Sequence, residues 1–396
     1  MRTIQEQEAQ YIINTYNRQP DKTPCLVKGE GSYLWDEKGR KYIDFLCGLA
    51  VNIVGHCHPE VVHAIQVQAA LLMHTSNLYY SEPQVNLARE LVKHSMAGKV
   101  FFANSGAEAN EAAIKLVRKN RPDRYKIITA HRSFHGRTLA TLTATGQPKY
   151  QRAFEPLVEG FSYACFNDLK SFEALIDAET AAIMIEPVQG EGGVYTAEKS
   201  FILGLRELCD RHGMLLIFDE VQCGMGRTGK LWAYENWDAK PDLLTAAKGL
   251  GGGLPIGALL VSEPYAAVLQ PGDHASTFGG NPVVCQASLA VLGILLQEGF
   301  LGTVLEKGLF LKTELTSLAA EFPHLIDEYR GIGMICALEL KQPLAGQIKD
   351  SCCADGLLIN AIGETTLRFL PPLTITVAEL AEGLAILKKT IYELKE

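Results

Sequence analysis

The chain has 396 residues, of which 47% are hydrophobic and 21% are charged, a balance typical of globular proteins. Its 37 Lys and Arg residues against 45 Asp and Glu residues give a net charge of −8, which argues against nucleic acid or an anionic membrane as the main partner. No apolar run reaches the roughly 18 residues that a membrane span needs, and the polar first residues are unlike a secretory signal. We therefore expect a cytoplasmic protein.

The ten cysteines include no C-x-x-C pair, so neither a zinc module nor a disulfide framework is expected. His56, Cys57 and His58, with Cys47 nearby, could be metal ligands, but their spacing fits no structural zinc pattern. We expect reduced thiols and no metal.

A helix is expected to begin within Asn104-Ser105-Gly106-Ala107, because an apolar helical stripe follows that segment. The free N–H groups and the positive dipole end of a helix suit a phosphate. An ordinary capped helix start explains the same residues equally well.

Further along the chain, short apolar runs alternate with amphipathic helices. One such helix is expected at residues 201–212, with Gly213 as its stop. This alternation predicts an α/β domain with a mainly parallel sheet. The runs that we expect to form buried parallel strands are residues 126–130, 182–185, 215–218, 243–247 and 256–261.

The C-terminal third has a different pattern, with a helix expected at residues 304–318 and short strands after it. Thr376 and Glu379 form a capping-box pattern that should open the last helix. We expect a smaller α+β domain at residues 277–396, a large domain at residues 51–276, and an N-terminal segment, residues 1–50, that packs with the small domain.

Polar residues stand where three of the predicted strands end: Glu186, Asp219 and Lys248. Ligands of open parallel sheets bind at the carboxyl ends of the strands. These positions are therefore candidates for a functional site, although every α/β protein has some polar strand ends.

The segment GMGRTGK, residues 224–230, fits both the dinucleotide glycine fingerprint and most of the phosphate-binding loop. The Ser or Thr that binds magnesium is missing, because Leu231 comes next, and Pro241 soon follows. We interpret the segment as a glycine-rich turn that shapes a wall of the site, with a nucleotide-dependent oxidoreductase or kinase as the alternative.

Pyridoxal phosphate (PLP) requires a lysine, an acid for its pyridine nitrogen, a platform for its ring and donors for its phosphate. The chain offers a candidate for each. Moreover, seven segments in this order closely resemble the class III PLP aminotransferases, and within them the bacterial acetylornithine branch: SGAEANEAAIK, SFHGRT, EPVQGEGG, IFDEVQCGMGRTG, AKGLGGGLPIGA, STFGGNP and TLRFLPPL.

The resemblance implies fold type I, which has a large and a small domain and works as a homodimer. Lys248 would bind the cofactor covalently and then move a proton between substrate and cofactor carbons. Asp219 would keep the pyridine nitrogen protonated. The other cofactor-binding residues implied are Gly106 and Ala107 (phosphate), Phe134 and Val221 (ring faces), Gln222 (ring hydroxyl), Glu220, and Thr277 from the neighbouring subunit.

The resemblance also implies how substrates bind, since a guanidinium grips a carboxylate with two parallel hydrogen bonds. Arg137 would hold the α-carboxylate of acetylornithine, and Arg368 that of glutamate or 2-oxoglutarate. Glu191 would cover Arg368 while a terminal amine reacts, and Ser276 would lie beside the substrate.

The implied reaction is transamination of N2-acetyl-L-ornithine with 2-oxoglutarate, which gives N-acetyl-L-glutamate 5-semialdehyde and L-glutamate in arginine biosynthesis. Leu49 is near a position where free-ornithine enzymes carry a tyrosine, and an apolar residue there suits an acylated nitrogen. Succinylornithine, succinyl-diaminopimelate, ornithine and 4-aminobutyrate stay open as alternative amines.

Overall fold

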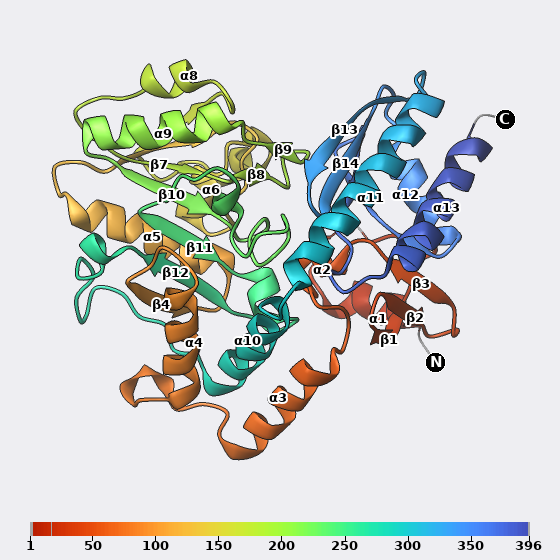
Figure 1. Cartoon of the computed structure of the whole chain (residues 1–396), viewed down its shortest axis with the longest axis horizontal. Coiled ribbons are helices and arrows are strands. Elements are labelled where there is room, and N and C mark those ends of the chain that lie inside the picture. The colour runs from red at the N-terminus through yellow and green to blue at the C-terminus, as the bar shows by residue number, and fades with distance from the viewer. Residues whose placement is uncertain (1–2, 17, 395–396) are drawn as a thin grey trace.

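A seven-stranded sheet forms the centre of the larger part of the molecule, in the order β4-β12-β11-β10-β7-β5-β6 (Figure 1). The computed structural model describes residues 3–16 and 18–394. The strands are β4 (Lys99–Ala103), β5 (Lys126–Ala130), β6 (Phe161–Ala164), β7 (Thr180–Ile185), β10 (Leu215–Asp219), β11 (Leu243–Ala246) and β12 (Gly257–Val261). Strands β6, β5, β7, β10 and β11 are parallel to one another. The sequence pattern predicts four of them, β5, β7, β10 and β11, but not β6.

The expectation of a parallel strand at residues 256–261 was wrong, because β12 is antiparallel to both β11 and β4. A parallel return needs a crossover of a dozen or more residues, usually with a helix. Between Ala246 and Gly257 the chain has room only for the short 3₁₀ helix η4 (Lys248–Gly251) and a turn in which Gly252 and Gly253 have positive φ. The chain therefore turns back beside the strand that it has just left.

Two helices cover opposite faces of this sheet. Helix α5 (Gly106–Asn120) packs its apolar stripe on Leu215 and Ile217, whereas α9 (Lys199–His212) belongs to the core that contains Leu216 and Phe218. Successive side chains of a strand point to opposite faces, so both faces of β10 are buried. The helix ends agree with the sequence: the Ser105 hydroxyl accepts from the Glu108 amide, and Gly213 has a φ of 60°.

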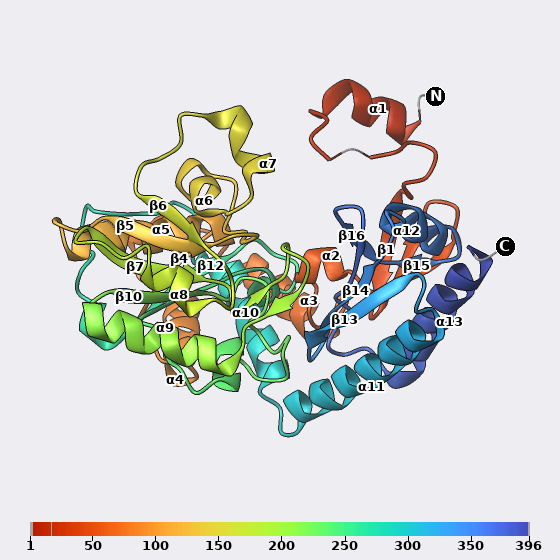
Figure 2. The ribbon, with the colours of Figure 1, turned by 90° about the horizontal axis from the view of Figure 1, so that it is seen from above.

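The smaller part combines an N-terminal and a C-terminal segment of the chain, and β1 lies among the C-terminal elements in Figures 1 and 2. One of its four-stranded sheets has the order β13-β14-β17-β16, and the other has the order β1-β2-β3-β15. Strand β3 is parallel to β15, so the N-terminal segment is built into this part. The strands are β1 (Leu26–Glu30), β2 (Tyr33–Asp36), β3 (Lys41–Asp44), β13 (Ile326–Ile332), β14 (Ile335–Leu340), β15 (Leu357–Leu358), β16 (Asn360–Ile362) and β17 (Thr366–Phe369).

Helices α11 (Phe300–Glu321), α12 (Ala345–Ala354) and α13 (Val377–Glu393) surround these sheets, and the capping box of Thr376 and Glu379 is confirmed at the start of α13. The preceding helix α10 (Pro282–Leu295) packs instead on α3 (Pro59–Leu71) and α4 (Glu82–Lys93) of the larger part. We therefore propose that the small domain begins near residue 300 and not at residue 277.

The remaining elements are short, apart from α1 at the N-terminus. They are α1 (Ile4–Tyr11), α2 (Cys47–Ala50), η1 (Ser76–Leu78), α6 (Leu139–Ala144), α7 (Pro148–Gln151), η2 (Arg152–Phe154), α8 (Leu169–Glu173), the strand pair β8 (Val188–Gln189) and β9 (Tyr195–Thr196), η3 (Ala233–Asn236) and η5 (Glu263–Tyr265). Within the described part of the chain, no single helix has the length and apolar character of a membrane span; α10 and α11 meet those criteria only as a pair bent by 73°.

Candidate active site

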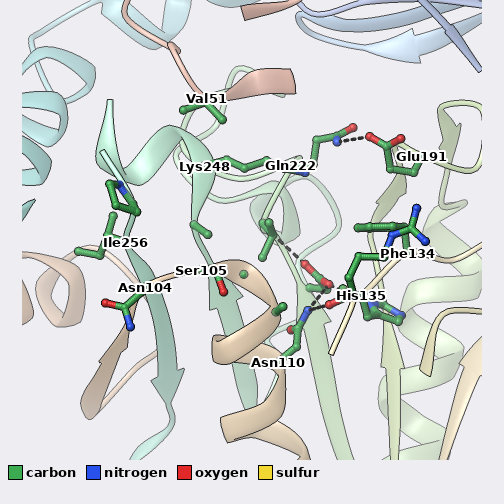
Figure 3. Close-up of a pocket in the computed structure, with 18 of the residues that line it drawn as sticks. Val51, Asn104, Ser105, Asn110, Phe134, His135, Glu191, Gln222, Lys248 and Ile256 are labelled. Atoms are coloured by element: carbon green, nitrogen blue, oxygen red, sulfur yellow. Dashed lines mark hydrogen bonds and ion pairs between the residues drawn. The ribbon is translucent and has the colours of Figure 1, made fainter. Parts of the chain in front are cut away.

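A cavity of about 430 Å³ lies at the carboxyl ends of the neighbouring strands β7, β10 and β11 (Figure 3). Glu186, Asp219 and Lys248, the polar residues at these three strand ends, all line it. The volume falls in the range of small-molecule and cofactor sites. Among residues 3–16 and 18–394, no group of three His, Cys, Asp or Glu side chains is placed to hold a metal ion.

Lys248 follows β11 directly and has a φ of 45°, a left-handed conformation that costs free energy in any residue other than glycine. Burial lowers the pKa of its ammonium group. An amine with a lowered pKa is more often unprotonated and is then a better nucleophile. The strained backbone and the desolvated amine both indicate that Lys248 is a reactive residue.

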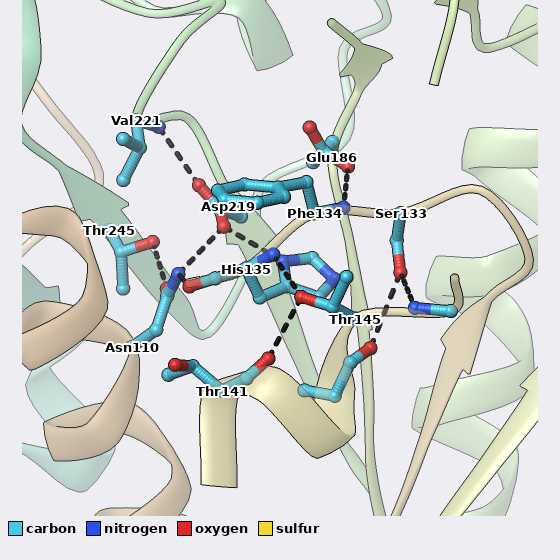
Figure 4. A network of polar contacts seen from close by, with 12 residues as sticks. Asn110, Ser133, Phe134, His135, Thr141, Thr145, Glu186, Asp219, Val221 and Thr245 are labelled. Atoms are coloured by element: carbon cyan, nitrogen blue, oxygen red, sulfur yellow. Dashed lines mark hydrogen bonds and ion pairs between the residues drawn. The ribbon is translucent and has the colours of Figure 1, made fainter. Parts of the chain in front are cut away.

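The Asp219 carboxylate is buried and held in place by three hydrogen bonds (Figure 4). Its Oδ2 contacts Asn110 Nδ2 at 2.7 Å and His135 Nδ1 at 2.8 Å, and its Oδ1 accepts from the Val221 amide at 3.0 Å. The Thr245 hydroxyl donates to Asn110 Oδ1 at 2.7 Å and so fixes the amide orientation. The result is an anion of fixed position that can pair with a cationic ring nitrogen.

Asn110 and His135 were not among the residues predicted from the sequence. A signal was present for Asn110, because it lies four residues after Gly106 and therefore on the same face of α5. His135 stands between two residues that were predicted, Phe134 and Arg137. Both side chains act on the site through Asp219.

The first turn of α5 opens into the cavity through Ser105, Gly106 and Ala107. A Cβ on Gly106 would lie only 2.7 Å from Val221 Cγ1, so only glycine lets the helix approach this wall so closely. The amides of a first helical turn have no partners within the helix and suit an anion. This turn is the natural place for a phosphate group.

Val221 and Phe134 both line the cavity and can offer apolar surfaces to a flat ring. The Phe134 amide donates to Glu186 Oε1 at 2.9 Å, which anchors the loop that carries the aromatic ring. Burial, together with the nearby Asp219 charge, raises the pKa of Glu186. Glu186 therefore supports this wall of the site.

Two arginines differ sharply in exposure. Arg137 is exposed at the cavity wall, with its guanidinium 3.8 Å from the centre of the Tyr150 ring. Arg368, on β17, is fully buried, and its Nη1 contacts Glu191 Oε1 at 2.6 Å and Gln222 Oε1 at 3.1 Å. One arginine is thus free to meet a ligand, and the other is covered.

Glu191 covers Arg368 as a charged group. Burial alone would raise the pKa of Glu191, but the charges of Arg368 and Lys248 lower that pKa to about 2. Gln222 Nε2 also donates to Glu191 Oε1 at 3.0 Å (Figure 3). The carboxylate therefore stays ionised and pairs with the buried guanidinium.

Four of the predicted site residues do not line this cavity. Arg368 contacts Glu191 and Gln222, which do line it. The Glu220 carboxylate accepts from the amides of Ala233 and Tyr234 on the far side of the strand end, and its burial raises its pKa to about 8. Ser276 and Thr277 lie at a separate surface hollow. Asn104 connects the two places, because it lines the cavity and its Nδ2 contacts Ser276 Oγ at 3.2 Å.

Residues 224–230 form consecutive turns, and the next element along the chain is the short η3. The nucleotide motifs require a helix directly after the glycine loop, so the interpretation as a glycine-rich turn is confirmed. None of these residues lines the cavity, so the expectation that the turn shapes a wall of the site was wrong. Residues 224–229 are buried, and Arg227 Nη1 donates to the Met334 and Pro371 carbonyls. Leu49 is 43% exposed, and Val51 is the residue of its segment that lines the cavity.

The cavity supplies every group that PLP requires: an amine at Lys248, a buried carboxylate at Asp219, a helix N-terminus at Gly106 and two apolar walls. The chemistry of these residues fits the cofactor.

Comparisons with known proteins agree with this geometry. The family "Aminotransferase class-III" matches residues 15–391. The acetylornithine aminotransferase of Caldanaerobacter subterraneus is 49% identical and covers 98% of this chain and 99% of its own, and that of Methanocaldococcus jannaschii is 46% identical with 98% of each chain covered.

Solved structures give the same result. The N-acetylornithine aminotransferase of Stenotrophomonas maltophilia has a TM-score of 0.83 and 40% identity, covering 96% of this chain and 97% of its own. The ornithine aminotransferase of Toxoplasma gondii has a TM-score of 0.94 and 31% identity, with 100% and 96% covered. The chain therefore belongs to the class-III aminotransferases, and its cofactor is pyridoxal phosphate.

Proposed function

We propose that the enzyme transfers the terminal amine of N2-acetyl-L-ornithine to 2-oxoglutarate, giving N-acetyl-L-glutamate 5-semialdehyde and L-glutamate, as a step of arginine biosynthesis. The observation that carries the proposal is the difference between its two arginines: Arg137 is exposed, whereas Arg368 is buried and paired with Glu191 at 2.6 Å. Relatives named acetylornithine aminotransferase, at 46–49% identity, support the same substrate.

When bound, PLP supplies an aldehyde carbon for the amino group and a ring that accepts electron density. In our proposal Lys248 Nζ would hold the cofactor and, once released by the substrate amine, would carry a proton between the two reacting carbons. Asp219, held by Asn110 and His135, would keep a proton on the ring nitrogen. The amides of Gly106 and Ala107 would bind the phosphate, and Phe134, Val221 and Gln222 would hold the ring.

The first half-reaction brings in a terminal amine whose carbon bears no carboxylate. An uncovered Arg368 would then be a buried cation without an anionic partner, which is costly, and Glu191 removes that cost. Arg137 meets the distant α-carboxylate of acetylornithine at the wall of the cavity.

The second half-reaction brings in 2-oxoglutarate, whose reacting carbon is next to a carboxylate. That carboxylate needs a cationic partner inside the site, and Arg368 becomes available once the Glu191 side chain turns away. One pocket can thus accept a terminal amine and an α-amino acid in alternation.

We also propose that the enzyme is a cytoplasmic homodimer in which Thr277 completes the site of the neighbouring subunit, with Ser276 beside it. Large apolar side chains are exposed close to Ser276 and Thr277. This exposure supports the proposal that a second copy of the chain covers them. The exposed side chains include Leu78, Tyr79, Tyr80 and Phe278.

Single-turnover spectra with a panel of amines test the substrate proposal. The panel contains acetylornithine, succinylornithine, free ornithine and 4-aminobutyrate. Acetylornithine should convert the cofactor with the highest ratio of rate to dissociation constant. A preference for free ornithine or 4-aminobutyrate would overturn the proposal. The enzyme would then be a sister ω-aminotransferase, which is the second candidate. The TM-score of 0.94 with an ornithine aminotransferase supports that candidate.

A further inference from the structure

Three glycines surround Glu191, and a close neighbouring atom or a left-handed backbone disfavours any other residue at each of them. A Cβ on Gly190 would lie 1.7 Å from Gln222 Oε1, and one on Gly192 would lie 2.7 Å from the Arg132 carbonyl oxygen. Gly193 has a φ of 116°, which only glycine adopts readily. The 190–193 loop is therefore tightly enclosed, with Glu191 as its only side chain.

Arg330, on β13 of the smaller part, reaches the far end of this loop. Its Nε donates to the Gly193 carbonyl at 2.9 Å, and its guanidinium lies 4.3 Å from the centre of the Tyr195 ring. Its side chain is only 10% exposed. Arg132 of the larger part stacks on the same ring at 4.8 Å.

The remaining donors of Arg330 tie it to its own sheet. Nη1 contacts Glu328 at 2.6 Å and Nη2 contacts Glu339 at 2.5 Å. Glu339 also accepts from the Thr366 hydroxyl at 2.8 Å, and Thr366 is two residues before Arg368 on β17. The guanidinium is thus held in a fixed orientation by the strands that also carry Arg368.

Arg330 and Arg368 lie in one row of that sheet, because Arg330 opposes Ala337 on β14 and Ala337 opposes Arg368 on β17. Directly opposed residues of antiparallel strands point to the same face, so the two arginines share a face and are about 10 Å apart. Arg368 Nη1 donates to the Gly190 carbonyl at 2.9 Å. The two arginines therefore hold the two ends of one four-residue loop.

We propose that Arg330 is a positioning residue for substrate choice: it fixes the 190–193 loop against the small-domain sheet, so that only the Glu191 side chain moves when Arg368 is uncovered. This inference rests on the proposed role of Glu191. Without Arg330 the loop would be attached at one end only, and Glu191 would cover Arg368 less effectively.

The test compares Arg330→Gln with Arg132→Gln, a matched control that removes a cation from the same tyrosine ring. In single turnovers of the holoenzyme, Arg330→Gln should lower the preference for acetylornithine over glutamate by roughly three- to thirtyfold, as expected for residues of one network. Arg330→Lys should restore part of the preference, since it keeps the charge but not the planar fork. Arg132→Gln should leave the preference unchanged.

A double-mutant cycle with Glu191→Gln separates positioning from general damage. Once Glu191 is absent, Arg330→Gln should have little further effect on the preference. The proposal would be overturned if Arg330→Gln slowed both half-reactions equally and if its effect added to that of Glu191→Gln.

Hydrogen exchange of residues 188–196 supplies a readout that does not depend on turnover. Exchange in the holoenzyme should be faster in Arg330→Gln and unchanged in Arg132→Gln. If Glu191→Gln itself leaves the preference unchanged, the role of Glu191 fails, while faster exchange still supports Arg330 as the residue that holds the loop. If hydrogen exchange is unchanged in Arg330→Gln, Arg330 does not hold the loop, whatever the kinetic results are.

Discussion

Replacing Glu191 by Gln keeps the shape of the side chain and removes the charge that faces Arg368. Arg368 would retain the Gly190 carbonyl, Gln222 Oε1 and Asn360 Oδ1, the last at 2.8 Å, but no anion. The incoming α-carboxylate of glutamate or 2-oxoglutarate would then find the guanidinium without displacing a carboxylate. The variant should therefore favour the α-amino acid half of the reaction.

The size of this effect follows from the pKa of Glu191, which changes from an ordinary 4.5 to about 2 in the folded protein. A difference of about 2.5 pKa units corresponds to roughly 3.4 kcal/mol, or a factor of about 300, and the Lys248 charge supplies part of it. The Glu191 side chain is 24% exposed, so solvent weakens the pair, and the new amide still hydrogen-bonds. We expect a gain of about tenfold for glutamate relative to acetylornithine, with about 300-fold as the upper limit.

The assay is single-turnover conversion of the bound cofactor with glutamate and, separately, with acetylornithine. Glu173→Gln is the control, because it removes an exposed ion pair with Arg211, at 3.2 Å, outside the site. That control should leave the ratio of the two half-reactions at the wild-type value. A change of both half-reactions by the same factor in Glu191→Gln would refute the covering role.

Further predictions concern the cofactor, the dimer and pH. Lys248→Ala should abolish turnover, and borohydride reduction of the wild type should place the pyridoxyl group on Lys248 in mass spectra; another lysine would contradict the assignment. Asp219→Asn should retain PLP by spectroscopy yet lose several orders of magnitude in rate, since a neutral ring nitrogen accepts electron density poorly. Mixing Lys248→Ala with Thr277→Ala chains should restore activity, because in a mixed dimer one site carries neither defect. Because the Glu191 pKa is lowered, its ion pair with Arg368 is complete above about pH 4.5 and is lost only as the pH falls through about 2. The ratio of the two half-reactions should therefore be constant from about pH 6 to 9.

The sequence predicted the elements that depend on local chemistry. The apolar stripe of α5, the stop at Gly213 and the capping box at Thr376 all depend on residues within one or two helical turns of one another. The convergence of Glu186, Asp219 and Lys248 followed from a general rule about parallel sheets. These inferences needed no knowledge of distant contacts.

Other features depend on what a local pattern does not encode. The apolar run of β12 indicates burial but not direction, which the short connection from β11 decides. Asp219 and Glu220 are adjacent acids at one strand end, and adjacent side chains point to opposite sides, so only one of them lines the cavity. Helix α10 joins the larger part because its apolar surface fits α3 and α4, which are more than 180 residues earlier in the chain.

The parallel pairing of β3 with β15 has a consequence for synthesis of the chain. Ile43 and Asp44 lie opposite Leu357 and Leu358, so 314 residues must follow Asp44 before its partner strand is complete. At 5–20 residues per second, the ribosome needs roughly 15 to 60 s to supply them. Throughout that interval one edge of β3 lacks its partner strand. The strands of the seven-stranded sheet are all synthesised before β15, so they can pair during the same interval. Nascent chains should therefore be most prone to aggregation and to proteolysis near their N-terminus, and chaperones that bind exposed strands should be found there.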